Sequence, residues 1–452
     1  MLHLVALALP IGSHLGGWRH PEAFEDSVGS LEAGIEIAQL AERGKFDLLF
    51  LADGNGVRAL DKPRLFAANT PTNRPGWFEP TTYFSAIAMT TRHIGLVATA
   101  TTTYEEPYLV ARKFASLDRL SKGRAGWNIV TTSMAEDSMN FSRDEHVPRD
   151  ERYERAREFV EIVFGLWDSW AADAFVHDKA TGQYLDPSKV HILDHKGKHF
   201  SVRGPLNVAR SPQDRPLVFN AGQSEDGKDV SARYADCVFA QTETKEIAQG
   251  FYADVKGRMG AYGRDPTSLR IIPGASIYVG RSRAEADELY DELNALIAPE
   301  LGLDFLAKQL QMNLSDYDVD GPVPKIEGER VGMNSNRLAL GQMAEKEGLT
   351  IRQLYERIVP TYGHPLFKGN AVDIADQIED WYRSKACDGF MVQFPVVPRG
   401  LRDFVDLVVP ELQRRGLFRK DYAGRTLREN MGLPAPASRY FSAASFLDVE
   451  PA

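Results

Sequence analysis

The stretch Gly123-Arg-Ala-Gly-Trp-Asn-Ile-Val-Thr-Thr-Ser133 joins a glycine-broken turn to a β-branched strand that ends in polar side chains. The strand finishes with Trp127, Asn128 and a row of hydroxyl groups. Polar groups at the C-terminal end of a buried strand are typical of barrel enzymes, which keep their chemistry there. The stretch therefore predicts a buried strand whose polar end opens at the mouth of a barrel.

Seven other short apolar runs alternate with longer helical patterns along the chain. Strands that are buried on both faces and joined by helical crossovers form a parallel sheet. Eight such units without a second sheet predict an α/β fold, a (β/α)8 barrel of the TIM type. A doubly wound open sheet is the alternative, because strand number alone does not exclude it. The expected strands are residues 2–9, 46–52, 94–100, 124–131, 216–221, 237–241, 270–279 and 389–394.

Four segments are longer than a barrel requires. We expect them to be insertions and a tail on a single domain that spans residues 1–452. Long insertions on a compact fold act as lids, substrate walls or interface arms. They are residues 54–78, 171–213 and 298–369 and the tail 418–452. The expected helices are residues 31–43, 81–92, 108–120, 152–167, 226–234, 247–262, 282–297, 372–384 and 401–415, with two more at 337–347 and 351–358.

Composition narrows the class of protein. The 452 residues are 43% apolar and 10% aromatic, enough for a large core, and the net charge of -10 argues against a nucleic-acid partner. Cys237 and Cys387 allow at most one disulfide, and buried free thiols suit a reducing cytoplasm. The sequence shows neither a signal-peptide pattern nor an apolar run of about 20 residues. We therefore expect a cytoplasmic protein without a membrane partner.

The sequence Gly54-Asn-Gly-Val-Arg-Ala59 follows a strand and matches a G-x-G-x-x-A pattern. The dinucleotide-binding fingerprint requires a helix to open at that point. Here Pro63 follows closely and no amphipathic pattern continues, so we predict a loop and no dinucleotide site.

Three histidines, His191, His195 and His199, stand four residues apart. On a helix this spacing would align three imidazoles for zinc. The surrounding sequence instead predicts a hairpin that turns at Lys196-Gly197, which would point the histidines in different directions. We therefore expect no metal site.

Polar candidates stand at the same ends of different predicted strands: Asp53, Thr99, Asn128 and Ser224. Each has a plainer interpretation, such as loop capping, β-propensity or helix capping. Gly222 permits close backbone approach, and Ser224 as an N-cap would leave free amides that suit a phosphate. Together these residues predict one mouth where a planar, phosphorylated ligand binds.

Longer stretches of the chain resemble the nitrilotriacetate monooxygenase component A family, within the bacterial-luciferase-like, flavin-dependent monooxygenases. Relatives in that family act on dibenzothiophene sulfone, long-chain alkanes and aminopolycarboxylates. The resemblance rests on Phe46-Asp-Leu-Leu-Phe-Leu-Ala-Asp53, Thr101-Thr-Thr-Tyr-Glu-Glu-Pro-Tyr108, the stretch from Gly123, Val202-Arg-Gly-Pro-Leu-Asn-Val208 and Leu407-Val-Val-Pro-Glu-Leu-Gln-Arg-Arg-Gly-Leu417.

The resemblance implies a luciferase-like barrel that uses reduced FMN (FMNH2) from a separate NAD(P)H:flavin reductase. Molecular oxygen would be activated at the flavin as a peroxide, and a small organic substrate oxidised, often with cleavage of a C–N or C–S bond. The relatives also suggest a homodimer or homotetramer. Two alternatives remain open: a deazaflavin-dependent oxidoreductase on the same barrel, and a flavin-binding protein without turnover.

The resemblance also implies roles for particular residues. Asp53 would face the isoalloxazine edge, with Thr99 near the ring and Asn128 on its polar side. Tyr153 would contact the phosphate-bearing end of the flavin, and Ser224 would cap the phosphate.

Arg149 stands where relatives commonly carry histidine. Arginine remains charged at every working pH and grips phosphate through a planar fork. His14, after the first strand, is a candidate for protonating or hydrogen-bonding the peroxide, with a structural loop role as the alternative. Segment 54–78 carries four basic residues, Arg58, Lys62, Arg64 and Arg74, against Asp61. If it lines the mouth, it favours an anionic substrate.

Overall fold

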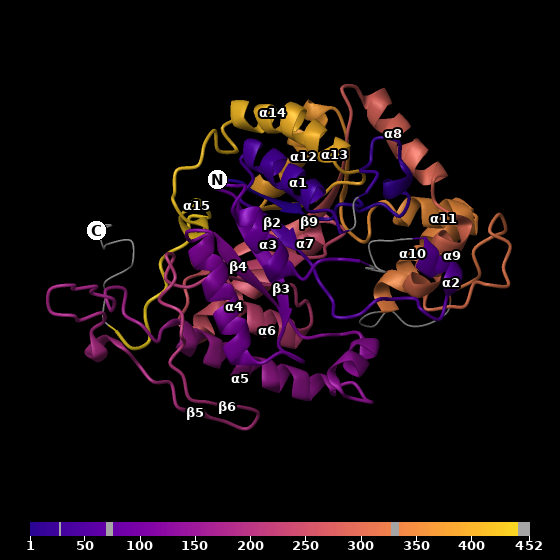
Figure 1. Cartoon of the computed structure of the whole chain (residues 1–452). Helices are drawn as coiled ribbons and strands as arrows, with labels where there is room; N and C mark the ends of the chain where they lie inside the picture. Colours follow the sequence, from indigo (N-terminus) through magenta and orange to yellow (C-terminus); the bar gives the residue numbers. More distant parts are fainter. Residues whose placement is uncertain (27–28, 69–75, 327–333, 442–452) are drawn as a thin grey trace.

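A closed ring of eight parallel strands forms the centre of the protein. The structure is a computed structural model that describes residues 1–26, 29–68, 76–326 and 334–441. Strand β9 pairs with β8 on one side and with β11 on the other, which closes the ring (Figure 1). The ring contains β1 (His3–Leu7), β2 (Leu48–Leu51), β3 (Gly95–Thr101), β4 (Ala125–Val130), β7 (Leu217–Asn220), β8 (Cys237–Ala240), β9 (Arg270–Val279) and β11 (Gly389–Gln393). The predicted (β/α)8 barrel is confirmed, and the open-sheet alternative is wrong.

One further strand joins the sheet outside the ring. β10 (Leu366–Gly369) pairs with Ser276–Val279, the part of β9 that extends beyond its pairing with β8. These residues belong to segment 298–369, which the sequence predicts to be an insertion. A strand of four residues with one lysine carries too little periodicity to be recognised, and only the ten-residue length of β9 offers it a partner.

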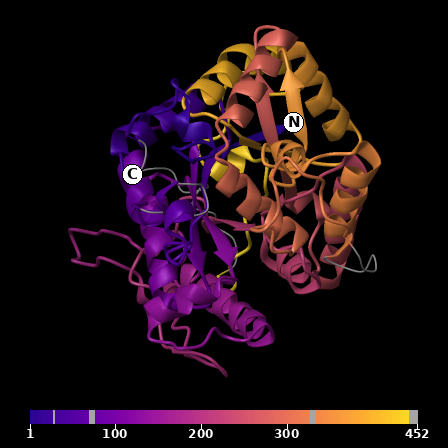
Figure 2. The ribbon, with the colours of Figure 1, turned by 90° about the vertical axis from the view of Figure 1, so that its right-hand side faces the viewer.

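Helices surround the strands (Figure 2). They are α1 (Leu31–Arg43), α3 (Pro80–Ala88), α4 (Pro107–Leu120), α5 (Arg149–Trp167), α6 (Glu225–Tyr234), α7 (Lys245–Arg258), α8 (Arg283–Ala295) and α12 (Ala371–Arg383). The helix expected at 401–415 is interrupted: α13 (Arg399–Asp403) and α14 (Val409–Arg414) flank a π-helical turn, Phe404–Val408. Pro410 follows that turn and has no N–H to donate, so the regular ladder cannot run through it. None of the described helices is both long and apolar enough to cross a bilayer.

The long segments carry small elements of their own. The first holds a loop and α2 (Pro63–Ala67), so no helix opens at Gly54, as predicted. The third holds α9 (Pro299–Leu310), α10 (Asn334–Glu347) and α11 (Ile351–Ile358), which gather with α2 beside the barrel (Figure 1). The tail carries α15 (Leu427–Asn430). Their assignment as insertions and a tail on a single domain stays a prediction.

The second long segment contains the predicted hairpin. Strands β5 (His195–Lys196) and β6 (Ser201–Val202) are antiparallel, and the turn between them starts at Gly197. His195 Nε2 lies 2.9 Å from Glu158 Oε1, whereas His191 stacks on Tyr440, so the histidines do point apart. Among the described residues, no group of three His, Cys, Asp or Glu side chains is placed to hold a metal ion.

Aspartates fix the N-terminal ends of three strands; Asp47 is buried, and Asp236 and Asp388 are half-buried. Asp47, Asp236 and Asp388 each directly precede a strand of the ring. Each accepts a hydrogen bond from a backbone N–H of the neighbouring strand, at 2.8 to 2.9 Å. A charged acceptor strengthens these bonds, so the three aspartates hold the register of adjoining strands.

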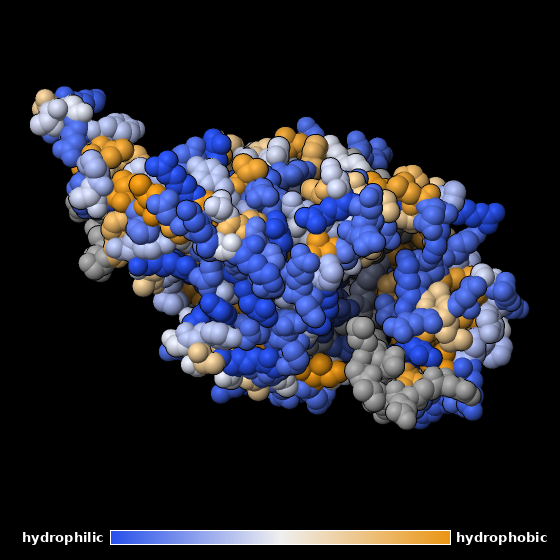
Figure 3. All heavy atoms as spheres, turned by 90° about the horizontal axis from the view of Figure 1, so that it is seen from below, coloured by the Kyte–Doolittle hydropathy of each residue, from blue (hydrophilic) through white to orange (hydrophobic). Residues whose placement is uncertain are grey.

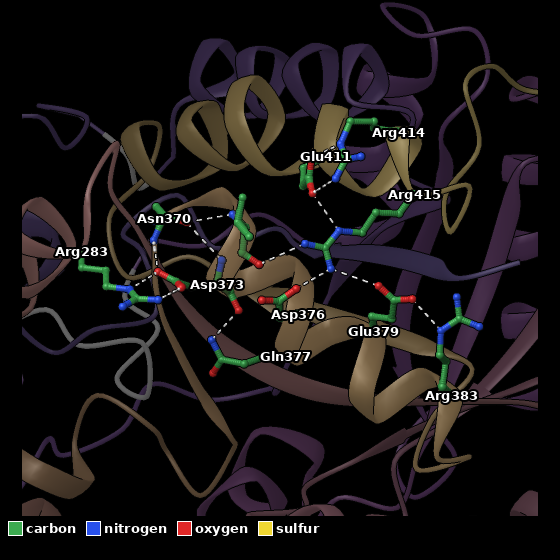
Figure 4. Close-up of polar contacts among 11 residues, drawn as sticks. Arg283, Asn370, Asp373, Asp376, Gln377, Glu379, Arg383, Glu411, Arg414 and Arg415 are labelled. Carbon is green, nitrogen blue, oxygen red and sulfur yellow. Dashed lines mark hydrogen bonds and ion pairs between the residues drawn. The ribbon is translucent and has the colours of Figure 1, made fainter.

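Ion pairs tie the C-terminal part of the chain to this end of the barrel. Arg419 pairs with Asp47, and Arg428 contacts both carboxylate oxygens of Asp236 at 3.0 Å. Nearby, Arg415 joins α14 to α12 through Glu379 and two further carboxylates (Figure 4).

We predict that Arg419→Ala destabilises the fold by about 3–5 kcal/mol, because it leaves Asp47 buried without its cation. Burial opposes ionisation of Asp47, yet Arg419 and His3 hold its pKa below the usual value. The pair therefore stabilises the fold above pH about 4 and loses that effect as the pH falls further.

Urea unfolding at pH 7 and at pH 3.5 measures the free energy of unfolding that Arg419→Ala loses. The matched control is Arg402→Ala, which removes an exposed pair with Glu36 and should cost under about 1 kcal/mol. Equal losses of stability in the two variants would contradict the prediction.

Candidate functional site

A cavity of about 1340 Å³ opens at the C-terminal ends of β2, β3 and β4. Its walls are Asp53 and the loop after it, the ends of β3 and β4, and residues of α9 that include Phe305 and Lys308. Figure 3 shows the surface hollowed between the barrel and the side that carries α9 to α11. This is the end of a barrel at which its enzymes place their active sites.

Thr99 and Asn128 form a buried pair at this mouth. The β3–β4 register places them opposite each other. Thr99 Oγ1 donates its hydrogen to the Leu51 carbonyl at 2.8 Å, so it must accept from Asn128 Nδ2, at 2.9 Å. This fixes the amide with Oδ1 as a buried acceptor that has no hydrogen-bond partner among the described residues. Such an atom is costly, about 1–3 kcal/mol, unless a ligand donates to it.

A second group surrounds the start of α6. Ser224 is the N-cap and accepts from Gly227 N–H at 3.3 Å, while Tyr153 Oη lies 3.2 Å from Ser224 Oγ. A Cβ atom on Gly222 would come within 2.6 Å of Gly227 Cα, so two glycines are needed for this approach. The arrangement leaves amide groups of the first helical turn available to an anion, which the helix dipole also favours.

Arg149 is the first residue of α5 and lies beside this group. Its guanidinium is 5.4 Å from the ring centre of Tyr153, and Nη2 lies 3.0 Å from Asp226 Oδ2. Asp226 also pairs with Arg157, at 3.3 Å. Arg149 is thus near the start of α6, with half of its side chain exposed, and an incoming phosphate would compete with Asp226 for it.

The structure brings the expected residues together in two neighbouring groups. Asp53 and Thr99 line the cavity, and Asn128 is hydrogen-bonded to Thr99. Gly222, Ser224, Tyr153 and Arg149 belong to the helix starts after β7 and β4. The β4–β7 ladder connects the groups. That these residues bind a cofactor stays a prediction.

His14 lies apart from both groups. It is buried, its Nδ1 accepts from Gly16 N–H at 3.1 Å, and it is not among the residues that line the cavity. Burial lowers the pKa of His14 to about 4, so the imidazole is uncharged at neutral pH. Of the two predicted roles, hydrogen bonding suits an uncharged imidazole better than proton donation. Both roles stay predictions.

The basic residues of segment 54–78 are paired with carboxylates that the sequence analysis did not connect to them. Arg58 pairs with the buried Asp137, in the loop after β4. Lys62 and Arg64 form ion pairs with two residues of α9: Asp304 accepts a hydrogen bond from Lys62 at 3.0 Å, and Glu300 lies 3.5 Å from Arg64. Arg74 lies outside the described residues. Part of the segment does line the cavity, but its charges are largely neutralised within the protein.

The model of the Luciferase-like monooxygenase family matches residues 10–382. The chain belongs to this family. It is 46% identical to N-acetyl-S-(2-succino)cysteine monooxygenase of Bacillus subtilis, over 95% of this chain and 96% of that protein. It is 45% identical to nitrilotriacetate monooxygenase component A of Aminobacter aminovorans, over 94% and 95% of the two chains. The solved structure of a riboflavin lyase with modified FMN and riboflavin superposes with a TM-score of 0.79 at 30% identity, covering 96% of each chain.

Membership in the luciferase-like family establishes the class of enzyme. The chain is a flavin-dependent monooxygenase, as its resemblance implied, and its relatives include two-component enzymes of this kind. Of the alternatives left open by the sequence, neither a deazaflavin oxidoreductase nor a binding protein without turnover matches this class.

We predict that Asn128→Leu weakens FMN binding about tenfold, because it removes the buried acceptor that a flavin N–H would satisfy. Fluorescence titration with FMN measures the affinity. Asn313→Leu, which changes an exposed asparagine, is the control and should leave the affinity unchanged. An unaltered affinity in Asn128→Leu would show that this amide does not contact the flavin.

Proposed function

We propose that this protein is the oxygenase component of a two-component monooxygenase. It uses reduced FMN from a separate reductase, and molecular oxygen, to oxidise a small organic substrate with cleavage of a C–N or C–S bond. The observation that carries the proposal is the unpartnered Oδ1 of Asn128 at the mouth, together with the close approach of Gly222 and Gly227 on either side of Ser224. The first is a place for a polar ring edge, and the second is a place for a phosphate.

The residues present fit FMN. At the phosphate end, Ser224, the first-turn amides of α6, Tyr153 and Arg149 would hold the dianion. At the ring end, Thr99 and Asn128 would orient the isoalloxazine, with Asp53 at its edge. When bound, reduced FMN supplies the electrons that activate oxygen, and the protein contributes binding, orientation and exclusion of water.

The apolar part of the cavity wall would exclude water from the reacting atoms. Leu15, Leu301 and Phe305 contribute to it beside the polar ends of β3 and β4. A dry wall on the substrate side also strengthens each hydrogen bond made inside the site, because water no longer competes for the same atoms.

For the substrate, we propose a thioether or amine that carries carboxylates, in agreement with the predicted anionic class. The names of the two relatives at 45–46% identity support this class of compound. Lys308 and Arg58 are the cavity cations best placed to meet a carboxylate, although each already contacts an aspartate. A substrate carboxylate would share them with these aspartates.

Two kinds of partner belong to the proposal. A flavin reductase would deliver the reduced FMN by transient association, which the relative's designation as component A supports. A second or further copy of the chain would form a homodimer or homotetramer, the usual state of enzymes of this size.

Arg149→Gln should weaken binding of FMN by about fivefold and leave binding of riboflavin unchanged, because riboflavin lacks the phosphate. Titration with both flavins measures the difference. Arg157→Gln is the matched control, since Arg157 shares the partner Asp226 but lies two turns further along α5. An equal loss of affinity for both flavins would show that Arg149 does not contact the phosphate.

Oxygen consumption with FMN, NADH and a generic flavin reductase tests the proposed reaction. The panel holds aminopolycarboxylates, carboxylated thioethers, sulfones, sulfonates and alkanes, and released peroxide is measured in each case. We expect a carboxylated thioether or amine to raise oxygen uptake while suppressing peroxide. Preference for a neutral, apolar substrate would refute the anionic class, and peroxide equal to oxygen across the panel would count against the proposed reaction.

A further inference from the structure

The loop that follows α11 enters the mouth of the barrel. Tyr362 lines the cavity, and its backbone lies in the left-handed region at φ +48°. Gln241, at the end of β8, donates to the Tyr362 carbonyl at 2.6 Å, and Ser276 N–H of β9 donates to the Pro365 carbonyl at 3.0 Å. These bonds hold the unfavourable backbone conformation of Tyr362 in place. They thereby direct the side chain of His364, two residues further along, into the barrel.

His364 occupies the space that a missing side chain leaves on β9. Ile272 and Met391 belong to the inner core of the barrel, so Gly274 and Gln393, two residues further along their strands, also face inward. A Cβ atom on Gly274 would lie 2.6 Å from His364 Nδ1 and 2.8 Å from Gln393 Nε2. Only glycine at this position leaves room for the imidazole.

The same inward-facing layer contains the Thr99–Asn128 pair. Val97 is part of the inner core, and Thr99 follows it by two residues. In the ring order, β3 and β4 stand across the barrel from β9. Asn128 and His364 therefore reach the upper layer of the barrel interior from opposite sides.

Both side chains carry a buried polar atom without a partner among the described residues. These atoms are Asn128 Oδ1 and His364 Nδ1, and each residue is at least nine-tenths buried. Buried polar atoms without partners are rare, and two of them on one layer require an explanation. Burial lowers the pKa of His364 to about 4, so its imidazole is neutral and offers a hydrogen bond without charge.

We propose that His364 is a flavin-binding residue, which hydrogen-bonds the isoalloxazine ring system from the side of the barrel opposite Asn128. This inference rests on the proposed function and extends it, because it makes the loop after α11 part of the flavin site. A neutral imidazole recognises the ring and not the phosphate. His364 should therefore contribute equally to the binding of FMN and of riboflavin, whereas Arg149 should contribute to the binding of FMN alone.

The test compares FMN and riboflavin as probes, by fluorescence titration with oxidised and with dithionite-reduced flavin. His364→Leu should lower the affinity for both flavins by the same factor, about tenfold. His364→Gln, which retains hydrogen-bonding groups and is a second variant in case the leucine misfolds, should weaken both less than about threefold. His177→Leu, at an exposed loop position, is the control and should change neither. In wild-type protein labelled with ¹⁵N-histidine, the His364 signals should shift when riboflavin is added.

Unchanged affinities in His364→Leu would overturn the inference. A loss confined to FMN would also overturn it, since it would assign the imidazole to the phosphate. Failure of the proposed function gives a different result: the wild-type protein would then bind neither flavin, in either redox state.

Discussion

The site depends on the register between β3 and β4. This register sets Thr99 opposite Asn128, and a slip of one residue in β4 would turn Asn128 to the outer face of the barrel, away from Thr99. The start of β4 is held by Asp118, whose buried carboxylate accepts from Ala125 N–H at 2.9 Å. Aspartates that precede three other strands hold their neighbours in the same way. Carboxylates at one end of the barrel thus determine which polar atoms meet at the other end.

The two ends of the barrel have different physical characters. At the N-terminal end, Asp47, Asp236 and Asp388 accept hydrogen bonds from backbone amides. The first two also pair with arginines from the C-terminal segment, whereas Oδ2 of Asp118 has no hydrogen-bond partner in the described part of the chain. At the mouth, Asn128 and His364 each retain a buried atom without a partner in the described part of the chain. Unsatisfied polar atoms such as these cost stability. A ligand with polar edges would remove that cost when it binds.

The eight barrel strands were predictable because short apolar runs between turns are a local property of the sequence. The hairpin at His195 was predictable for a similar reason, from the turn residues after it. The pairing of Arg58 with Asp137 was not, because the two lie 79 residues apart and no periodicity connects them. Gly274 likewise has no distinctive sequence context, and only the folded chain places His364 in the space beside it. The mouth residues on strand ends were therefore found, whereas those supplied by segment 298–369 were missed.

A crystal structure of the protein with FMN would show where the flavin binds. We expect the isoalloxazine at the mouth of the barrel, with its polar edge on Asn128 and with His364 on the opposite side. We expect the phosphate at the start of α6, beside Ser224 and Tyr153. Electron density that places the flavin away from the ends of β3 and β4, or its phosphate away from α6, would show that these residues do not form the flavin site.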